Sequence, residues 1–392
     1  MTEAKFTNFK YTDEFTLNFD VFGYDCSFVN AIRRTILSKV PTLGFRTYYG
    51  KESDIKIIKN TSPLHNEFLA HRLSMIPIHF DYNKINDFES KNFEFLIKKK
   101  NNTNKIIHVT SKDIEIRDTS KENTTILSDK IRDTFFPKDS ITGDYILINK
   151  LKPSKSGLDD EGEELDIVMK ATLGIGEEHS QFCPTCVSVF INIRDEAKCE
   201  IDFKQLIEKK NIERKGIPLS NDEIIAEKKI FNIMDADRCY QTDERGEPNA
   251  FHFTIESDGR IPSHLILLKS LEILKKTLFK FIDEIKNEDI IDIVKSNCIM
   301  NAYDIILEDK DYTLGYLLQY YVFKLYQNVD TPVIKYIASD IPHPLENKLL
   351  IRIGFVDDNT VITSIRKLLS NTCQYINQEI SKLFIQIKTH KF

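Results

Sequence analysis

Two stretches near opposite ends of the chain share one arrangement of apolar and polar positions. In residues 25–40, Phe28 and Ile32 open a series of apolar residues at helical spacing, which predicts an amphipathic helix. Asp25 or Ser27 can accept hydrogen bonds from the free amides of its first turn. The opposite face carries two adjacent arginines, so the predicted helix has one side to bury and one side to expose.

The same arrangement returns from Asp311, where Thr313 takes the place of Ser27 and Leu318 takes the place of Ile32. Each copy follows a stretch of alternating residues that is typical of a β-strand. A unit of strand, turn and helix near both ends indicates two related modules, each offering an apolar helical face for the other to cover. Two amphipathic helices that look alike by chance would show the same spacing, and the spacing alone does not separate the two interpretations.

Later in each proposed module, apolar residues recur at alternating four- and three-residue spacings, which predicts a long helix with a seam for packing along another helix. The first long helix begins after a turn capped by Ser263, and the second covers 361–387. Both modules therefore follow the order strand, helix, strands, long helix. The first seam includes Leu267, Leu271, Leu274 and Leu278, and the second includes Ile365, Leu369, Ile376 and Ile380.

An insert, residues 51–185, splits the first module. Its alternating positions predict a hairpin over 93–116 with three lysines, 98–100, at the tip. These lysines indicate either a nucleic-acid contact or a solvated loop. Further expected elements are a strand over 43–49, an acidic surface loop over 158–164, a strand over 165–171 and a charged, helix-prone elaboration over 204–229.

The bulk properties narrow the class of protein. The chain has 392 residues and is 41% hydrophobic, which is enough for two or three buried cores. A formal net charge of −6 argues against a free-standing nucleic-acid binder, because such proteins draw affinity from surplus Lys and Arg. No signal peptide is visible, and no run reaches the ~18 apolar residues that a membrane span needs. The seven cysteines, an odd number, fit a reducing compartment, so we expect an intracellular protein without a membrane partner.

Residues 174–199 hold the densest set of candidate metal ligands. A tetrahedral zinc site needs four ligands, and the set that could supply them is His179, Cys183, Cys186 and Cys199. This stretch has one tight cysteine pair, whereas a closed zinc finger normally has two. A thioredoxin-like redox pair would open a helix, yet a strand is expected after Cys186. Buried cysteines at a strand end are the third interpretation.

Several motifs occur in order along nearly the whole chain. They are Asn30-Ala-Ile-Arg-Arg34 with Val40-Pro41, the segment Asn66-Glu-Phe-Leu-Ala-His-Arg-Leu-Ser-Met-Ile-Pro77, the segments 170–184 and 253–259, and the C-terminal pair 308–315 and 342–345. Up to residue 259 they resemble the bacterial alpha subunit and the eukaryotic third-largest subunit of multisubunit DNA-dependent RNA polymerases. The C-terminal pair resembles the eleventh subunit, the smaller partner of the third.

The resemblance implies an α+β fold in which two alpha-subunit-like dimerisation modules form an intrachain pseudo-dimer, the first interrupted by an inserted, mainly β domain. Such a fusion is similar to the arrangement in large cytoplasmic DNA viruses. The expected domains are residues 1–50 and 186–290 for the first module, 51–185 for the insert and 291–392 for the second module.

The resemblance also implies a non-catalytic platform subunit that nucleates assembly of the two large catalytic subunits of a DNA-directed RNA polymerase. A small zinc-ribbon-type subunit would be a further partner, DNA contact would be indirect, and no cofactor is expected. The compartment would be host cytoplasm and virion for a viral protein and the nucleus otherwise. The residues expected at subunit interfaces are Asn30, Arg33, Arg34, His71, Arg72, Leu314 and His343, together with the eight seam residues named above.

The chain departs from the family pattern in three places. Residues 78–110 contain no cysteine, where many eukaryotic third subunits carry a zinc-binding cluster, so we expect no structural zinc there. Cys183 stands where the family has a serine, which favours the interpretation as a buried cysteine. Tyr316 and Gln319 replace the usual Asn and Arg, so the large-subunit contact of the second copy is not carried over.

Two rival hypotheses remain. One is a zinc-dependent nucleic-acid-binding regulator built on the four candidate ligands, which the metal content would separate from a platform. The other is a stand-alone hydrolase using His71 or His179, which an activity assay would separate. The sequence shows no Asp-rich metal loop, phosphate-binding Gly-Lys-Ser/Thr loop or nucleophile triad at a credible spacing.

The platform hypothesis carries two further expectations. The isolated chain should be a monomer, because the two seams satisfy each other within one molecule. Arg33 and Arg34 should face solvent, so replacing both with alanine should leave the melting temperature of the free chain nearly unchanged and abolish co-purification with the second-largest polymerase subunit.

Overall fold

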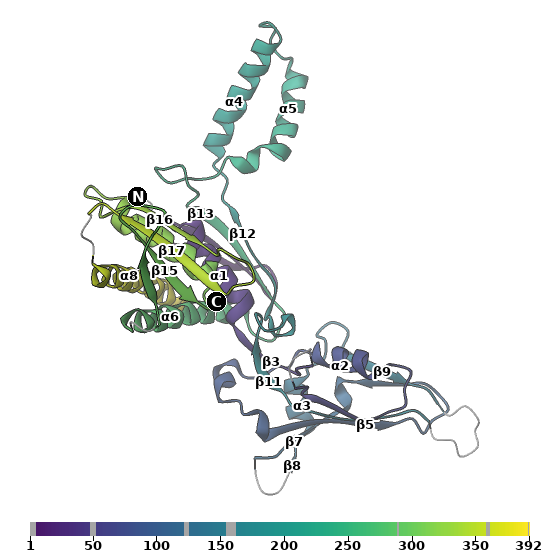
Figure 1. Ribbon diagram of the computed structural model, residues 1–392. Helices are drawn as coiled ribbons and strands as arrows, with labels where there is room; N and C mark the ends of the chain where they lie inside the picture. The colour runs from purple at the N-terminus through teal and green to yellow at the C-terminus, as the bar shows by residue number, and fades with distance from the viewer. Residues whose placement is uncertain are drawn as a thin grey trace. The chain divides into compact units, whose positions relative to one another are not determined.

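The computed structural model describes residues 5–47, 52–120, 125–153, 162–287, 290–357, 361–390 and 392. The chain forms two compact units (Figure 1). The first, which we call the paired-module unit, comprises Met1–Ile36, Val187–Glu256 and Ser263–Phe392. The second, the insert unit, comprises Leu37–Cys186 and Ser257–Pro262.

The first module of the paired-module unit is a four-stranded sheet with one short and one long helix. The strands lie in the order β1-β2-β13-β12, and β2 pairs antiparallel with both β1 and β13. Phe19 of β2 stacks on Phe6 and Phe253 at ring-centroid distances of 5.3 and 5.1 Å, so alternate residues of these strands build one core. The elements are β1 (Lys5–Tyr11), β2 (Thr16–Phe22), α1 (Cys26–Lys39), β12 (Thr185–Asn192), β13 (Ala250–Ser257) and α6 (Ser263–Lys286).

The second module repeats this plan. Its sheet has the order β14-β15-β17-β16, which matches the order of the first sheet strand for strand. The two modules are therefore related by topology as well as by sequence pattern. The likeness of their helices reflects a true repeat and not a chance similarity of two amphipathic helices. The elements are β14 (Asp292–Lys295), β15 (Ala302–Glu308), α7 (Tyr312–Val322), the π-helical turn η6 (Phe323–Gln327), β16 (Ile334–Asp340), β17 (Lys348–Phe355) and α8 (Ile362–Thr389).

The long helices α6 and α8 pack against each other and join the modules (Figure 1). Lys275 Nζ of α6 donates to Ser381 Oγ of α8 at 2.8 Å, and Arg366 of α8 donates to the Ile285 carbonyl near the end of α6 at 2.6 Å. The predicted α+β pseudo-dimer is confirmed. The apolar positions of the two predicted seams are at most 5% exposed: Leu267, Leu271, Leu274, Leu278, Ile365, Leu369, Ile376 and Ile380.

The insert unit is mainly β, as expected. Its largest sheet has the order β4-β10-β5-β7-β8, with the two-stranded pairs β11-β3 and β6-β9 beside it in the same unit. Phe95, Phe135 and Phe136 lie in its core together with the buried Leu69 and Leu73 of α2. The elements are β3 (Pro41–Gly44), β4 (Ile55–Asn60), α2 (Asn66–Ser74), β5 (Phe93–Lys100), β6 (Ile107–Thr110), β7 (Ile114–Asp118), β8 (Thr125–Ile126), α3 (Asp129–Phe135), β9 (Leu147–Leu151), β10 (Glu164–Met169) and β11 (Thr172–Ile175).

The hairpin predicted over 93–116 is confirmed only in part. β5 pairs antiparallel with β7, which joins the two ends of that range, but β6, the segment that directly follows the lysines, pairs with β9 instead of β5. The other neighbour of β5 is β10. The three lysines lie in β5 rather than at a tip. Lys98 forms an ion pair with Asp166 at 3.6 Å and Lys99 with Asp113 at 2.7 Å, so these two charges are matched inside the unit.

The insert unit begins earlier than the boundary expected at residue 51. It includes the last residues of α1 because β3 pairs antiparallel with β11. Arg260 ties the returning segment to the same unit, since its guanidinium donates to the Cys183 carbonyl at 2.7 Å and to Thr42 Oγ1 at 3.0 Å. The strand predicted over 43–49 ends at Gly44, and its last two residues lie outside the described residues, as does part of the acidic loop over 158–164.

The charged stretch over 204–229 forms a pair of helices, α4 (Glu196–Glu213) and α5 (Asn221–Met234), which lie side by side (Figure 1). Asp195 caps α4 by accepting from the Lys198 amide, and Ser220 with Glu223 forms a capping box on α5. A small core of Cys199, Phe231, Ala236 and Cys239 closes the base of the pair.

Candidate functional site

The first turns of α1 and α7 are built alike. Asp25 Oδ2 accepts from the amides of Ser27 at 2.7 Å and Phe28 at 3.3 Å, and Asp311 Oδ1 accepts from the Thr313 amide at 3.1 Å. A carboxylate at this position satisfies amides that the first turn leaves free. Of the two capping residues that the sequence offered for α1, the structure uses Asp25.

Arg34 connects the two modules. Its NH2 atom donates to Asp311 Oδ2 at 3.0 Å and its Nε donates to Thr313 Oγ1 at 2.7 Å. Burial raises the pKa of Asp311, but the hydrogen bonds from Thr313 and Arg34 outweigh it and hold this pKa below its ordinary value. The side chain of Arg34 is 42% exposed, so it faces solvent in part, and it is also held by a carboxylate of the second module that the sequence did not predict.

The neighbouring arginine stays on its own helix. Arg33 Nε donates to Asn30 Oδ1 at 2.9 Å, a contact one turn apart on α1. The structure therefore brings Asn30, Arg33 and Arg34 together on one face of α1, with the start of α7 beside Arg34.

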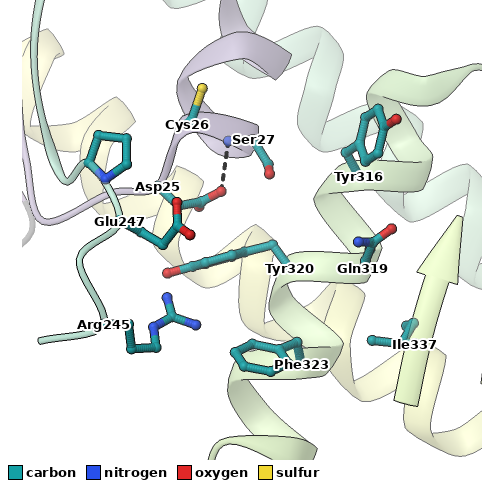
Figure 2. A pocket seen from close by; sticks show the side chains of 11 residues that line it. Asp25, Cys26, Ser27, Arg245, Glu247, Tyr316, Gln319, Tyr320, Phe323 and Ile337 are labelled. Atoms are coloured by element: carbon teal, nitrogen blue, oxygen red, sulfur yellow. Dashed lines mark hydrogen bonds between the residues drawn. The ribbon is translucent and has the colours of Figure 1, made fainter. Parts of the chain in front are cut away.

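A cavity of about 250 Å³ lies where α1, α7 and the loop before β13 meet (Figure 2). It contains the cap Asp25, the aromatic rings of α7 and η6, and the charged loop residues Arg245 and Glu247. A second cavity of about 470 Å³ shares Asp25, Arg245, Glu247 and Tyr320 with the first. The lining residues include Asp25, Arg245, Glu247, Tyr316, Tyr320 and Phe323.

Arg245 is held by its own loop. Its Nε and NH2 atoms donate to Asp243 Oδ2 at 3.1 and 2.9 Å, and its guanidinium lies over the rings of Phe323 and Tyr320 at 5.1 and 5.7 Å from their centroids. This arrangement combines an ion pair with cation–π contacts, so it fixes the loop against the second module.

Asp25 is the buried carboxylate of this cavity. It is 9% exposed, and its Oδ1 has no hydrogen-bond partner among the described residues. Burial raises the pKa of Asp25 to about 6, although the hydrogen bonds from Ser27 and Phe28 act in the opposite direction. Burial followed by the charge of Asp25 raises the pKa of Tyr320 to about 12.

The other expected interface residues have varied surroundings. His71 is exposed on α2, and Arg72 donates to the carbonyls of Ile148 at 3.0 Å and Leu147 at 2.8 Å within the insert unit. His343 is exposed in the turn before β17, and Leu314 is a buried core residue of α7.

The four candidate zinc ligands do not form one site. His179 Nδ1 accepts from the Gln181 amide, and Cys183 Sγ donates to the Thr185 carbonyl at 3.4 Å. Cys199 belongs instead to the small core at the base of α4, where its Sγ donates to the Ala236 carbonyl. No group of three or more His, Cys, Asp or Glu in the described part of the chain is placed to hold a metal ion.

The redox alternative also lacks its structural setting, because Cys186 lies in β12 and not at the start of a helix. Within the segments that the structure describes, no helix has both the length and the apolarity needed to cross a membrane.

Sequence reasoning missed the loop of Asp243, Arg245 and Glu247 and the cavity that it closes. Aligning the two repeats could have predicted part of the cavity. In that alignment Tyr320 of α7 corresponds to Arg34 of α1, so the cap of α1 meets a tyrosine where the cap of α7 meets an arginine. No local sequence pattern predicts the position of the loop, because its contacts are with α7, which is far away in sequence.

The matched sheets, paired helices and bridging Arg34 define a chain that carries both halves of an alpha-like dimer. Comparison with protein families agrees, since two models described as "RNA polymerase Rpb3/Rpb11 dimerisation domain" match residues 18–278 and 302–384. The chain belongs to the RNA polymerase Rpb3/Rpb11 dimerisation domain family.

Individual relatives are similar over most of their length. The "DNA-directed RNA polymerases I and III subunit RPAC1" of Homo sapiens is 25% identical over 314 residues, covering 70% of this chain and 83% of that protein. The "DNA-directed RNA polymerase subunit Rpo3" of Methanobrevibacter smithii is 28% identical over 285 residues, covering 65% and 89%. The Rpo3 protein of Pyrococcus furiosus is 27% identical over 282 residues, covering 70% and 94%.

Proposed function

We propose that this chain is a non-catalytic platform subunit of a DNA-directed RNA polymerase, on which the two large catalytic subunits assemble. The observation that carries the proposal is that two dimerisation modules of one family occur in a single chain and pair within one compact unit. The relatives described above are named as subunits of RNA polymerases, which supports membership of such a complex. The compartment is then that of the polymerase, host cytoplasm and virion for a viral enzyme and the nucleus otherwise.

The face formed by α1 and the start of α7 is the surface that we assign to the large subunits. Arg33 is oriented there by Asn30, and a planar guanidinium can hold a carboxylate or carbonyl of a partner through two parallel hydrogen bonds. The exposed His71 and His343 provide further polar contacts, and a small zinc-ribbon-type subunit completes the proposed set of partners.

The absence of a catalytic role is also part of the proposal. Asp25 and Asp311 cap helices and Arg34 bridges the modules, so their positions are explained by folding and pairing. Contact with DNA is indirect, through the assembled enzyme.

The test is purification of a tagged chain from its native source, followed by mass spectrometry of the proteins that accompany it. We expect both large polymerase subunits and the zinc-ribbon subunit in near-equal amounts with the chain. Recovery of the chain alone, or with proteins unrelated to transcription, contradicts the proposal.

A matched pair of variants tests whether binding of the large subunits requires the two modules to be paired. Leu271→Asp places a charge in the buried seam, where an unpaired charge opposes packing of α6 on α8. Ile191→Asp makes a similar change on the exposed side of β12, where the side chain is 64% exposed. Only the seam variant should lose the large subunits, and equal losses from both would count against the platform mechanism.

A further inference from the structure

The repeat makes α1 and α7 comparable position by position. With Thr313 in register with Ser27, Asp311 corresponds to Asp25, and Tyr320 corresponds to Arg34. Each cap of one module therefore faces a defined position on the helix of the other module. An ideal twofold pair would contain two identical contacts.

One of the two contacts is complete. Arg34 of α1 reaches the cap of α7 and forms an ion pair with Asp311 at 3.0 Å. The Asp311 carboxylate thus has amide donors on one side and a guanidinium on the other.

The corresponding contact lacks its cation. Asp25 faces Tyr320, which brings a phenol where the register would place an arginine (Figure 2). Asp25 Oδ2 caps α1, but Oδ1 is shielded from water and has no hydrogen-bond partner in the described part of the chain. Arg245, the nearby guanidinium, is committed to Asp243 and to the faces of Tyr320 and Phe323.

A buried carboxylate without a counter-charge is unfavourable, and a cation that donates a hydrogen bond relieves it. The surroundings suit such a cation. Tyr316 lines the cavity with an aromatic ring, which attracts guanidinium and ammonium groups. Glu247 adds a second carboxylate beside Asp25 (Figure 2), which disfavours a phosphate or another anion in the same place.

We propose that the cavity at Asp25 receives an arginine or lysine side chain from one of the large polymerase subunits, which completes the second half of the pseudo-symmetric contact. The proposal rests on the proposed function for its partner. The cation specificity of the cavity follows from residues of this chain alone.

The test in the assembled enzyme uses Asp25→Asn, which keeps an N-cap residue and removes the charge. Affinity for the large subunits should fall at least tenfold, while the melting temperature of the free chain at pH 7.5 should rise. A residue that serves only to fold the chain would lower both. Glu200→Gln, the same loss of one charge at an exposed position of α4, is the control and should change neither.

The test in the free chain uses two small probes, N-acetyl-arginine amide and N-acetyl-citrulline amide, which differ in charge but hardly in shape. Arginine amide should raise the melting temperature of the wild type more than citrulline amide, and Asp25→Asn should abolish the difference. Equal shifts from both probes, or wild-type assembly by Asp25→Asn, would overturn the proposal. If the wild-type chain binds no large subunit, the proposed function fails, and the difference between the probes alone decides whether the cavity takes a cation.

Discussion

At the residue scale, Asp25 and Asp311 occupy the same capping position in their helices but have different pKa values because their surroundings differ. Asp311 meets an arginine and keeps a low pKa, whereas Asp25 is buried without such a partner and its pKa rises to about 6. The sequence offered Asp25 as one of two candidate caps of the first helix and placed Asp311 at the start of the matching stretch. It could not distinguish their environments, because Arg34 and Tyr320 reach them from the other module.

The first prediction follows from the raised pKa of Asp25. A carboxyl group whose pKa is higher folded than unfolded favours the folded state when protonated, so it costs stability as pH rises from about 4 to about 6. Relative to wild type, Asp25→Asn should gain roughly 2–3 kcal/mol at pH 7 and nothing below about pH 4. Urea unfolding of both proteins across this pH range checks it, and a gain that does not depend on pH would contradict it.

A second prediction separates the adjacent arginines. Arg34→Ala should lower the free energy of unfolding by up to about 1 kcal/mol, a modest loss because both partners of its ion pair are 42% exposed and screened by solvent. Arg33→Ala should leave stability within about 0.5 kcal/mol of the wild type, because its hydrogen bond is local to α1. Thermal melts of the two single variants decide it, and equal losses would show that Arg34 does not stabilise module pairing. The double variant should then also lose up to about 1 kcal/mol, whereas the sequence alone led us to expect a nearly unchanged melting temperature.

At the element scale, helices and strands with a strong periodic pattern were predicted well. The helix predicted over 361–387 is α8, Ile362–Thr389, and the strand predicted over 165–171 is β10, Glu164–Met169. The prediction of which strands pair with each other was less successful. β5 was expected to pair with the next apolar segment, β6, but its two neighbours in the sheet are β7 and, from far along the chain, β10. Alternation alone does not say which strand lies beside another.

The seam between the long helices contains a polar residue that no helical pattern explains. Asn377 of α8 is 4% exposed, and neither atom of its amide group has a hydrogen-bond partner among the described residues. Asn377→Leu should therefore stabilise the chain by about 1–2 kcal/mol, because it removes a desolvated amide of similar volume.

The matched control for this third prediction is Thr372→Val on the same helix. Thr372 is also fully buried, but its Oγ1 donates to the Leu368 carbonyl at 2.9 Å, so its hydroxyl is satisfied. Denaturant unfolding should show a gain for Asn377→Leu and no gain for Thr372→Val. A loss in Asn377→Leu would mean that the amide makes a contact that stabilises the seam.

At the scale of the whole molecule, the first and second modules fold against each other within one polypeptide. The family and the two-module fold could be predicted because several motifs kept their order. The boundary of the insert unit could not, because β3 and Arg260 join that unit through contacts with β11 and Cys183 that no local pattern reveals.

The fourth prediction concerns the oligomeric state. The isolated chain should be a monomer, because the partner of each seam is tethered and its effective concentration is high, in the millimolar range for a short linker. Light scattering at micromolar concentration should give a mass of 45.6 kDa. A stable species of twice that mass would contradict the prediction, and separating the halves by proteolysis would show whether it arises from exchanged modules.

The covalent connection between α6 and the second module has an evolutionary consequence. Two separate subunits must each avoid pairing with a copy of themselves, which constrains both surfaces against the wrong partner. In one continuous chain the two halves are always present in a one-to-one ratio, and each is covalently linked to its partner. The constraint against self-pairing is therefore relaxed. Substitutions such as Tyr316, Gln319 and Tyr320 on one side of the contact then carry no risk of creating a self-pairing half. The fused chain is free to let its two faces diverge, each toward a different neighbour.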